Sequence, residues 1–224
     1  MPYAYFWTGQ IIYDVAYLLL LLGLLFLGFA SYRIPRLYPR LFEAAVYYKE
    51  SIFFEEIKRY IAPSFFLLLG RLQFTLSLSL IVYLFLDAKG RLVGIALEET
   101  LLVLSLLFVG IYLYFVLHRL LYRTLGYVYL TPSLYNSWRD GYNLLEWLWS
   151  FPLYIAILMM TYSGGFEIGI WLASITFVLW RLFIIRRTLS VLKETNITYL
   201  QLSLYLCTHE IAPFALLAWM AIRG

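Results

Sequence analysis

The chain has 224 residues, of which 63% are hydrophobic and only 13% are charged, with a formal net charge of +4. Soluble domains contain about 25% charged residues, and the hydrophobic residues here come in blocks long enough to cross a bilayer as helices. These values exclude an ordinary soluble domain. They predict an all-α, polytopic membrane protein that forms one membrane domain over residues 1–224, contacts the lipid bilayer and binds no nucleic acid.

The first predicted span covers residues 11–30 and is followed by the long connection 31–63. In SYRIPRLYPR, two prolines and three arginines predict a stiff basic stretch at the level of the lipid headgroups. In ESIFFEEIKRYIAP, apolar residues recur at helical spacing opposite charged ones, which predicts an amphipathic helix along the membrane interface. The apolar face of this predicted helix holds Phe53, Phe54, Ile57, Tyr60 and Ile61, and its charged face holds Glu55, Glu56, Lys58 and Arg59. The alternative is a solvated connector without such a helix.

Five further hydrophobic blocks bring the number of predicted spans to six. Two of the connections between them are tight, DAKGR and SGG, and two are of medium length, 118–140 and 186–197. The five blocks cover residues 64–86, 92–117, 141–162, 166–185 and 198–222.

The basic residues predict the orientation of these spans. Twelve of them fall in the first, third and fifth connections, and only three, Lys89, Arg91 and Arg223, fall on the other side. Because basic residues resist translocation, the rich side should be cytoplasmic and both termini periplasmic. The twelve are Arg33, Arg36, Arg40, Lys49, Lys58, Arg59, Arg119, Arg123, Arg139, Arg186, Arg187 and Lys193.

The last predicted span contains an unusual polar stretch, YLCTHEIAPF. Glu210 lies about 18 Å along this span at 1.5 Å per residue, where a charge is costly and is commonly functional. Cys207 precedes it by three residues and shares its helix face. Pro213 cannot donate a hydrogen bond to the carbonyl of His209. A carboxyl group, an imidazole and a freed carbonyl are therefore expected within one turn.

Other ionisable residues inside the spans are expected at a similar depth. Arg71 and Thr75 lie on one stripe of the second span, and Glu146 and Arg181 lie in the cytoplasmic halves of the fourth and fifth spans. We therefore predict a buried polar cluster of Glu210, Arg71, Glu146 and Arg181, with Cys207, His209, Pro213 and Thr75 as secondary members. Three alternatives stay open. Arg181 could extend to the headgroups, Glu146 could face water there, and Arg71 with Glu210 could form a purely structural ion pair.

The two histidines are candidate haem ligands only if they lie at the same depth. His118 is expected at the cytoplasmic end of its span and His209 near mid-membrane, whereas a bis-histidine site needs both at one depth. The sequence has no cluster of metal ligands and no nucleotide or hydrolase motif. We therefore expect no cofactor, no metal and no enzymatic activity.

The residues Tyr205, Leu206, Cys207, Glu210 and Pro213 form a Tyr-Leu-Cys-x-x-Glu-x-x-Pro pattern. It resembles the C-terminal motif of a family of uncharacterised Bacteroidetes inner-membrane proteins that is defined only as a domain of unknown function. Weaker similarity covers WSFPLYIAILMMTY and RLFIIRRTL. The resemblance implies a bacterial inner membrane and a small helical bundle, and no reaction.

Two functions follow from these features. The first is a non-enzymatic subunit or scaffold of an envelope complex with protein partners in the membrane, which fits the small extramembrane mass. The second is an oligomeric proton- or ion-linked carrier in which Glu210 binds the ion. A lipid-modifying enzyme is the weakest candidate, because no nucleophile or metal site is evident.

Overall fold

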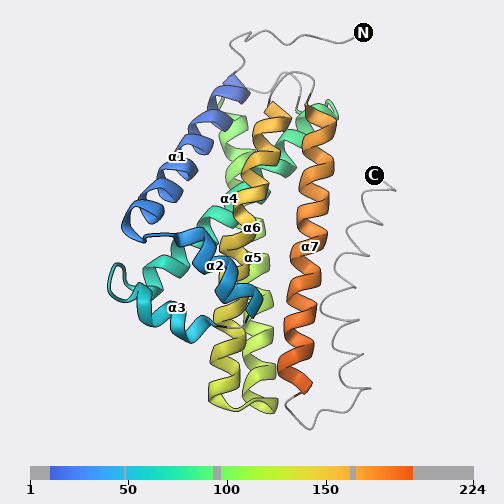
Figure 1. The fold of residues 1–224 in the computed structure, drawn as a ribbon. Helices are drawn as coiled ribbons and strands as arrows, with labels where there is room; N and C mark the ends of the chain where they lie inside the picture. Colours follow the sequence, from blue (N-terminus) through green and yellow to red (C-terminus); the bar gives the residue numbers. More distant parts are fainter. Residues whose placement is uncertain (1–10, 48, 93–96, 162–164, 194–224) are drawn as a thin grey trace.

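The computed structural model describes residues 11–47, 49–92, 97–161 and 165–193. These residues form seven α-helices (Figure 1), so the prediction of an all-α fold is confirmed. The helices are α1 (Ile11–Arg33), α2 (Leu37–Tyr47), α3 (Glu50–Ile57), α4 (Pro63–Ala88), α5 (Leu97–Tyr129), α6 (Pro132–Thr161) and α7 (Phe166–Lys193).

Five of the helices are long and apolar enough to cross a membrane. The sixth predicted span, residues 198–222, and with it Glu210, lies outside the described residues. Successive spanning helices run in opposite directions (Figure 1), so that α1, α5 and α7 end toward the lower side of the bundle in this view and α4 and α6 begin toward that side. We call this the basic end, because it carries the twelve basic residues counted above. The candidate spans are Asp14–Arg33, Pro63–Ala88, Leu97–Thr124, Pro132–Thr161 and Phe166–Val191.

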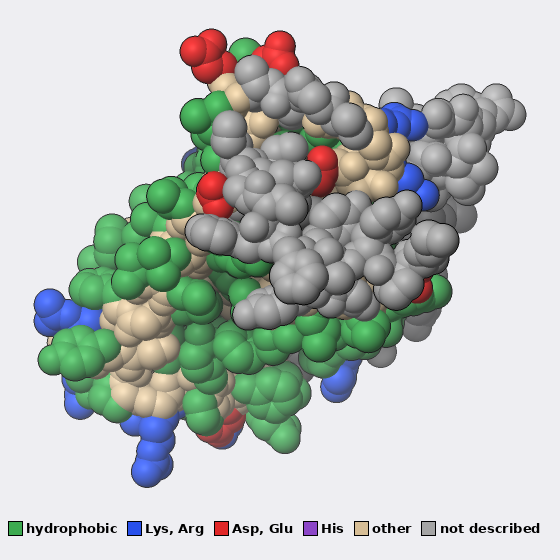
Figure 2. All heavy atoms as spheres, turned by 90° about the horizontal axis from the view of Figure 1, so that it is seen from above, with side chains coloured by type: hydrophobic (Ala, Val, Ile, Leu, Met, Phe, Trp, Pro, Cys, Tyr) green, Lys and Arg blue, Asp and Glu red, His purple; other side chains and the backbone are tan. Residues whose placement is uncertain are grey.

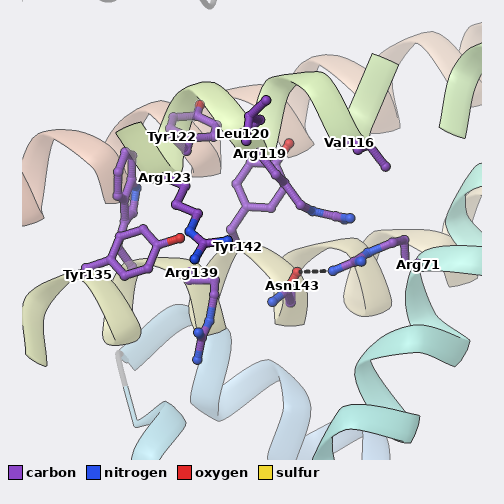
Figure 3. A pocket seen from close by; sticks show the side chains of 11 residues that line it. Arg71, Val116, Arg119, Leu120, Tyr122, Arg123, Tyr135, Arg139, Tyr142 and Asn143 are labelled. Carbon is purple, nitrogen blue, oxygen red and sulfur yellow. Dashed lines mark hydrogen bonds between the residues drawn. The ribbon is translucent and has the colours of Figure 1, made fainter. Parts of the chain in front are cut away.

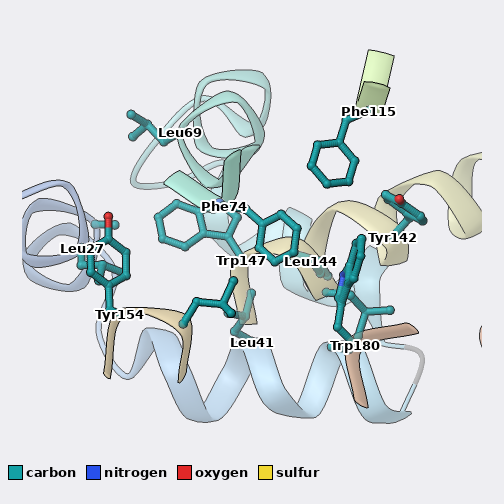
Figure 4. Close-up of a cluster of buried hydrophobic side chains, with 14 of the residues drawn as sticks. Leu27, Leu41, Leu69, Phe74, Phe115, Tyr142, Leu144, Trp147, Tyr154 and Trp180 are labelled. Carbon is teal, nitrogen blue, oxygen red and sulfur yellow. The ribbon is translucent and has the colours of Figure 1, made fainter. Parts of the chain in front are cut away.

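Helix α6 is the centre of the bundle and packs mainly against α4 and α7, whereas α5 packs mainly against α4. The reason lies in buried aromatic side chains (Figure 4). Trp147 stacks on Phe66 with ring centroids 4.7 Å apart, and its indole nitrogen donates to the Phe66 carbonyl oxygen at 2.8 Å. Gly70 of α4 makes this possible, since a β-carbon there would overlap the Trp147 ring. Phe74 and Trp180 extend the cluster toward α7, with ring centroids 4.8 Å apart.

The connection 31–63 is more ordered than the sequence indicates. In place of a stiff stretch and one interfacial helix, the structure has two helices, α2 and α3, that pack on α6. Helix α3 turns the expected apolar residues Phe53, Phe54 and Ile57 inward, and these residues contact protein rather than the membrane interface. The buried stripe of α2, which the sequence analysis missed, consists of Leu37, Leu41, Ala44 and Ala45.

The prediction of a medium connection over residues 118–140 was wrong. Helix α5 continues to Tyr129 and α6 begins at Pro132, so only two residues separate them. Hydropathy falls at residue 118 because the helices leave the hydrocarbon, but no proline interrupts them before position 132. Helix α7 likewise continues beyond residue 185 to Lys193.

The outer surface of the bundle is apolar. Hydrophobic side chains make up much of the described surface seen from the end opposite the basic end (Figure 2). Leu18 and Leu21 of α1, Leu106 of α5 and Trp171 of α7 are each at least 60% exposed. Such a surface is suited to lipid, and the chain is a multi-pass membrane protein.

Candidate functional site

A cavity of about 300 Å³ lies near the basic end and is lined by residues of α4, α5 and α6. Four arginines reach it (Figure 3), one from α4, two from α5 and one from α6. Arg119 and Arg123 are one helical turn apart on α5 and therefore share a face. The lining residues are Arg71, Val116, Arg119, Leu120, Tyr122, Arg123, Tyr135, Trp138, Arg139, Tyr142 and Asn143.

Aromatic side chains form the wall of the cavity toward α7. The Tyr122 ring meets Trp138 nearly edge-on at 4.6 Å and lies 5.6 Å from Tyr142. The Trp138 indole donates to the Thr188 hydroxyl of α7 at 3.1 Å. These contacts fix the wall, since both partners of the Trp138–Thr188 bond are buried.

Glu146 of α6 forms an ion pair with Arg119 of α5 beside the cavity. The Arg119 guanidinium binds both carboxylate oxygens, and the contact to Oε2 measures 2.6 Å. Glu146 is only 1% exposed, whereas the Arg119 side chain is 18% exposed. A buried carboxylate needs such a partner, because an unpaired charge is very costly away from water.

Arg71 approaches the same place from α4 (Figure 3) and is held more weakly. Its Nη2 atom lies 3.5 Å from the Asn143 side-chain oxygen, which is at the limit of a hydrogen bond. It is near enough to Arg119 and Glu146 to interact electrostatically with both. The buried Nε atom of Arg71 and the Nε and Nη1 atoms of Arg119 have no hydrogen-bond partner among the described residues.

A second buried ion pair joins α7 to α3, and its arginine also contacts α6. Arg187 of α7 pairs with Glu50 of α3, and its Nη2 atom also donates to the Ser137 carbonyl oxygen of α6 at 2.9 Å. Gly141 makes room for this side chain, because a β-carbon there would overlap the guanidinium. The sequence analysis assigned neither Arg187 nor Glu50 to a site.

The structure places the predicted cluster members at two locations. Arg71 lines the cavity, and Glu146 lies beside it through its ion pair with Arg119. Arg181, which is 7% exposed, donates to the Tyr114 hydroxyl at 3.0 Å and lies over the Trp180 ring at 4.6 Å. Glu210 and the secondary members Cys207, His209 and Pro213 lie outside the described residues.

The remaining predicted residues are in the interior. Thr75 is fully buried, and its carbonyl oxygen accepts a hydrogen bond from the Ser79 hydroxyl at 2.8 Å. His118 is buried beside tyrosine rings, the nearest of which is Tyr122 at 4.5 Å. Among the described residues no group of three or more acidic, histidine or cysteine side chains could hold a metal ion.

Arg119 is the main site residue that the sequence analysis missed, because it was counted only as a basic anchor at a helix end. The short link between α5 and α6 is the feature from which the pairing of Arg119 with Glu146 could be predicted. Arg119 lies about three turns before the link and Glu146 about four turns after it, so antiparallel helices bring them to similar heights. The two heights can be compared only when it is known that α5 ends at Tyr129 and α6 begins at Pro132.

The family model described as Domain of unknown function (DUF4271) covers residues 16–220 of the chain. No curated protein and no solved structure matches the chain.

Proposed function

The chain belongs to the DUF4271 family, and we propose that it is a non-enzymatic subunit or scaffold of an envelope complex in a bacterial inner membrane. The proposal keeps the Bacteroidetes origin that the C-terminal motif suggests. It also places the basic end on the cytoplasmic side, because basic residues resist translocation.

The observation that carries the proposal is that two buried carboxylates each form an ion pair with an arginine of another helix. Glu146 pairs with Arg119 across α5 and α6, and Glu50 pairs with Arg187 across α3 and α7. Each pair joins side chains of two different helices, and so stabilises one packing arrangement. A carrier needs a carboxylate that can exchange its ion, whereas both of these carboxylates already have a cationic partner.

The apolar outer surface supports the same function. Helix α1 lies at the edge of the bundle (Figure 1), and its outer leucines are more than half exposed, among them Leu18, Leu21 and Leu25. Lipid can cover this face, and so can a transmembrane helix of another protein. With little mass outside the spans, partners would be bound largely within the bilayer.

The proposal is tested by purifying the tagged full-length chain from its native host in a mild detergent and identifying co-purifying proteins by mass spectrometry. We expect the same envelope proteins in stoichiometric amounts in independent preparations. A matched preparation of an unrelated multi-pass protein from the same membranes serves as the control. Recovery of the chain without partners contradicts a scaffold role.

A carrier function depends on Glu210 and is tested separately with purified protein in liposomes. If the chain carries protons or ions, a pH or ion gradient should dissipate with the wild type and persist with Glu210→Gln. On the scaffold proposal, neither protein moves ions, and Glu210→Gln reduces partner recovery instead. Flux that depends on Glu210 would overturn the proposal.

A further inference from the structure

We infer that the arginine-lined cavity between α4, α5 and α6 is a binding site for a phosphate group, supplied by the headgroup of an anionic lipid or by a soluble phosphate compound. This site does not depend on whether the chain serves in a complex. It goes beyond the packing role of the buried ion pairs, because two of its arginines have no carboxylate partner among the described residues.

The charges at the cavity do not balance within the described residues. Glu146 neutralises Arg119, and Asp140 lies 3.0 Å from Arg139. Arg71 and Arg123 have no carboxylate within ion-pair distance in the part of the chain that the structure describes. Two positive charges are therefore left over at one cavity. A phosphate group carries one to two negative charges and matches them.

The unsatisfied donors point to the same ligand. Arg71 and Arg119 reach from two helices toward the space beside Asn143 (Figure 3). Between them they hold three buried nitrogen atoms without a hydrogen-bond acceptor among the described residues. Buried donors are nearly always paired, and leaving one unpaired costs free energy. Guanidinium groups bind the oxygens of phosphate in pairs, which would satisfy these donors.

The size and lining of the cavity fit a lipid headgroup. A volume of about 300 Å³ is at the lower end for small-molecule sites. Val116 and Leu120 border it and are 39% and 55% exposed on α5, so acyl chains could continue along that apolar surface. Arg71 lies about two turns inside α4, and its long side chain can extend toward the headgroup level. Basic cavities between membrane helices bind anionic headgroups for these reasons.

The test uses the delipidated full-length chain in a neutral detergent and measures its unfolding temperature against ligand concentration. The probes are dihexanoyl phosphatidylglycerol, dihexanoyl phosphatidylcholine and inorganic phosphate. The variants are Arg71→Gln, Arg71→Lys and Arg123→Gln. Arg59→Gln is the matched control, because Arg59 is exposed near the basic end and does not line the cavity.

We expect phosphatidylglycerol to raise the unfolding temperature and phosphatidylcholine to have a much smaller effect. Arg71→Gln and Arg123→Gln should each weaken the apparent affinity by roughly tenfold, since each removes a charged hydrogen-bond donor. Arg71→Lys should lie in between, and Arg59→Gln should bind as the wild type does. If inorganic phosphate competes with the lipid and stabilises equally well, the ligand is a soluble phosphate compound and the site stands.

Two results would overturn the inference: no stabilisation of the wild type by either anion, or an equal loss of affinity in the control variant. Should Arg71→Gln fail to fold, Arg123→Gln decides the question, because Arg123 is exposed and its replacement leaves the packing intact.

Discussion

Among the described acidic residues, Glu146 has the smallest exposed fraction, 1%, and it lies in the middle of the central helix α6. Its ion-pair partner in the described part of the chain is Arg119. Glu146→Gln keeps the size of the side chain and leaves the mostly buried Arg119 without its counter-charge. We expect a loss of about 3 kcal/mol in the free energy of unfolding, measured by equilibrium denaturation in mixed micelles.

Glu55→Gln is the matched control for this change. Glu55 pairs with Lys58 on the exposed face of α3, where water and salt screen the interaction. The exposed variant should unfold as the wild type does. Equal stability of Glu146→Gln and Glu55→Gln would mean that the buried pair does not hold α5 to α6.

Two glycines of the spanning helices allow a second comparison at the level of residues. A β-carbon at Gly141 would overlap the guanidinium of Arg187, whereas a β-carbon at Gly110 would meet nothing within 4 Å. Gly141→Ala should therefore displace Arg187 from Glu50 and cost about 1–3 kcal/mol. Gly110→Ala should be neutral or slightly stabilising, because alanine favours the helix. The measurement is unfolding in micelles, and destabilisation by Gly110→Ala alone would contradict the geometry.

The sequence located part of the candidate site for a clear physical reason. Charges within long apolar blocks are few, so Arg71, Glu146 and Arg181 could be identified from their positions alone. The residues that contact them could not be identified in this way. Asn143 and Arg119 look like ordinary residues near a helix end, and only the height of each helix against its neighbours shows which side chains meet.

At the level of elements, α2 is the helix that the sequence analysis did not predict. Two prolines and three arginines in residues 31–40 suggested a stiff surface stretch. The helix nevertheless forms, because Pro39 falls in its first turn, where its missing N–H has no helical partner to lose. Its stripe of small and branched residues then packs on α6. The composition of this segment shows its positive charge. Its packing could not be predicted in the same way, because it depends on α6, which is distant in the sequence.

The packing of α2 gives a direct test. Leu41 is fully buried, whereas its neighbour Phe42 is 52% exposed. Leu41→Ala should lower the free energy of unfolding by about 2–5 kcal/mol through lost contacts and a cavity. Phe42→Ala removes more atoms from an exposed site and should cost much less. If α2 merely rested on the membrane surface, the two variants would be equally stable in micelles.

The ends of α5, α6 and α7 show the limit of hydropathy at this scale. The profile reports where a segment leaves the hydrocarbon, and a helix ends only where capping or proline ends it. The two points differ by about three turns at residues 118–129, and two of the cavity arginines, Arg119 and Arg123, lie on this extension. The predicted connection was therefore the region where the candidate site is built.

For the molecule as a whole, the class of fold followed from composition, because only helices satisfy every backbone group within a single apolar segment. The arrangement of those helices did not follow. Helix α6 is central because it carries Trp147, Tyr154 and Glu146 on faces that three different helices cover. In a hydropathy profile, Trp147 and Tyr154 do not differ from the tryptophans and tyrosines that face lipid.

The orientation of the bundle is the last property that the charge distribution predicts, and it can be tested on intact cells. Ser51 of α3 lies near the basic end and Ala88 closes α4 at the opposite end, and both are exposed. In a background where the single cysteine, Cys207, is replaced by serine, Ser51→Cys and Ala88→Cys each provide one thiol and alter no charge. Twelve basic residues against three should hold the basic end in the cytoplasm. A membrane-impermeant maleimide should therefore label Ala88→Cys in intact spheroplasts and label Ser51→Cys only after lysis. The reverse pattern would place the arginine-lined cavity on the outer side of the membrane, where a ligand would have to come from the outer leaflet.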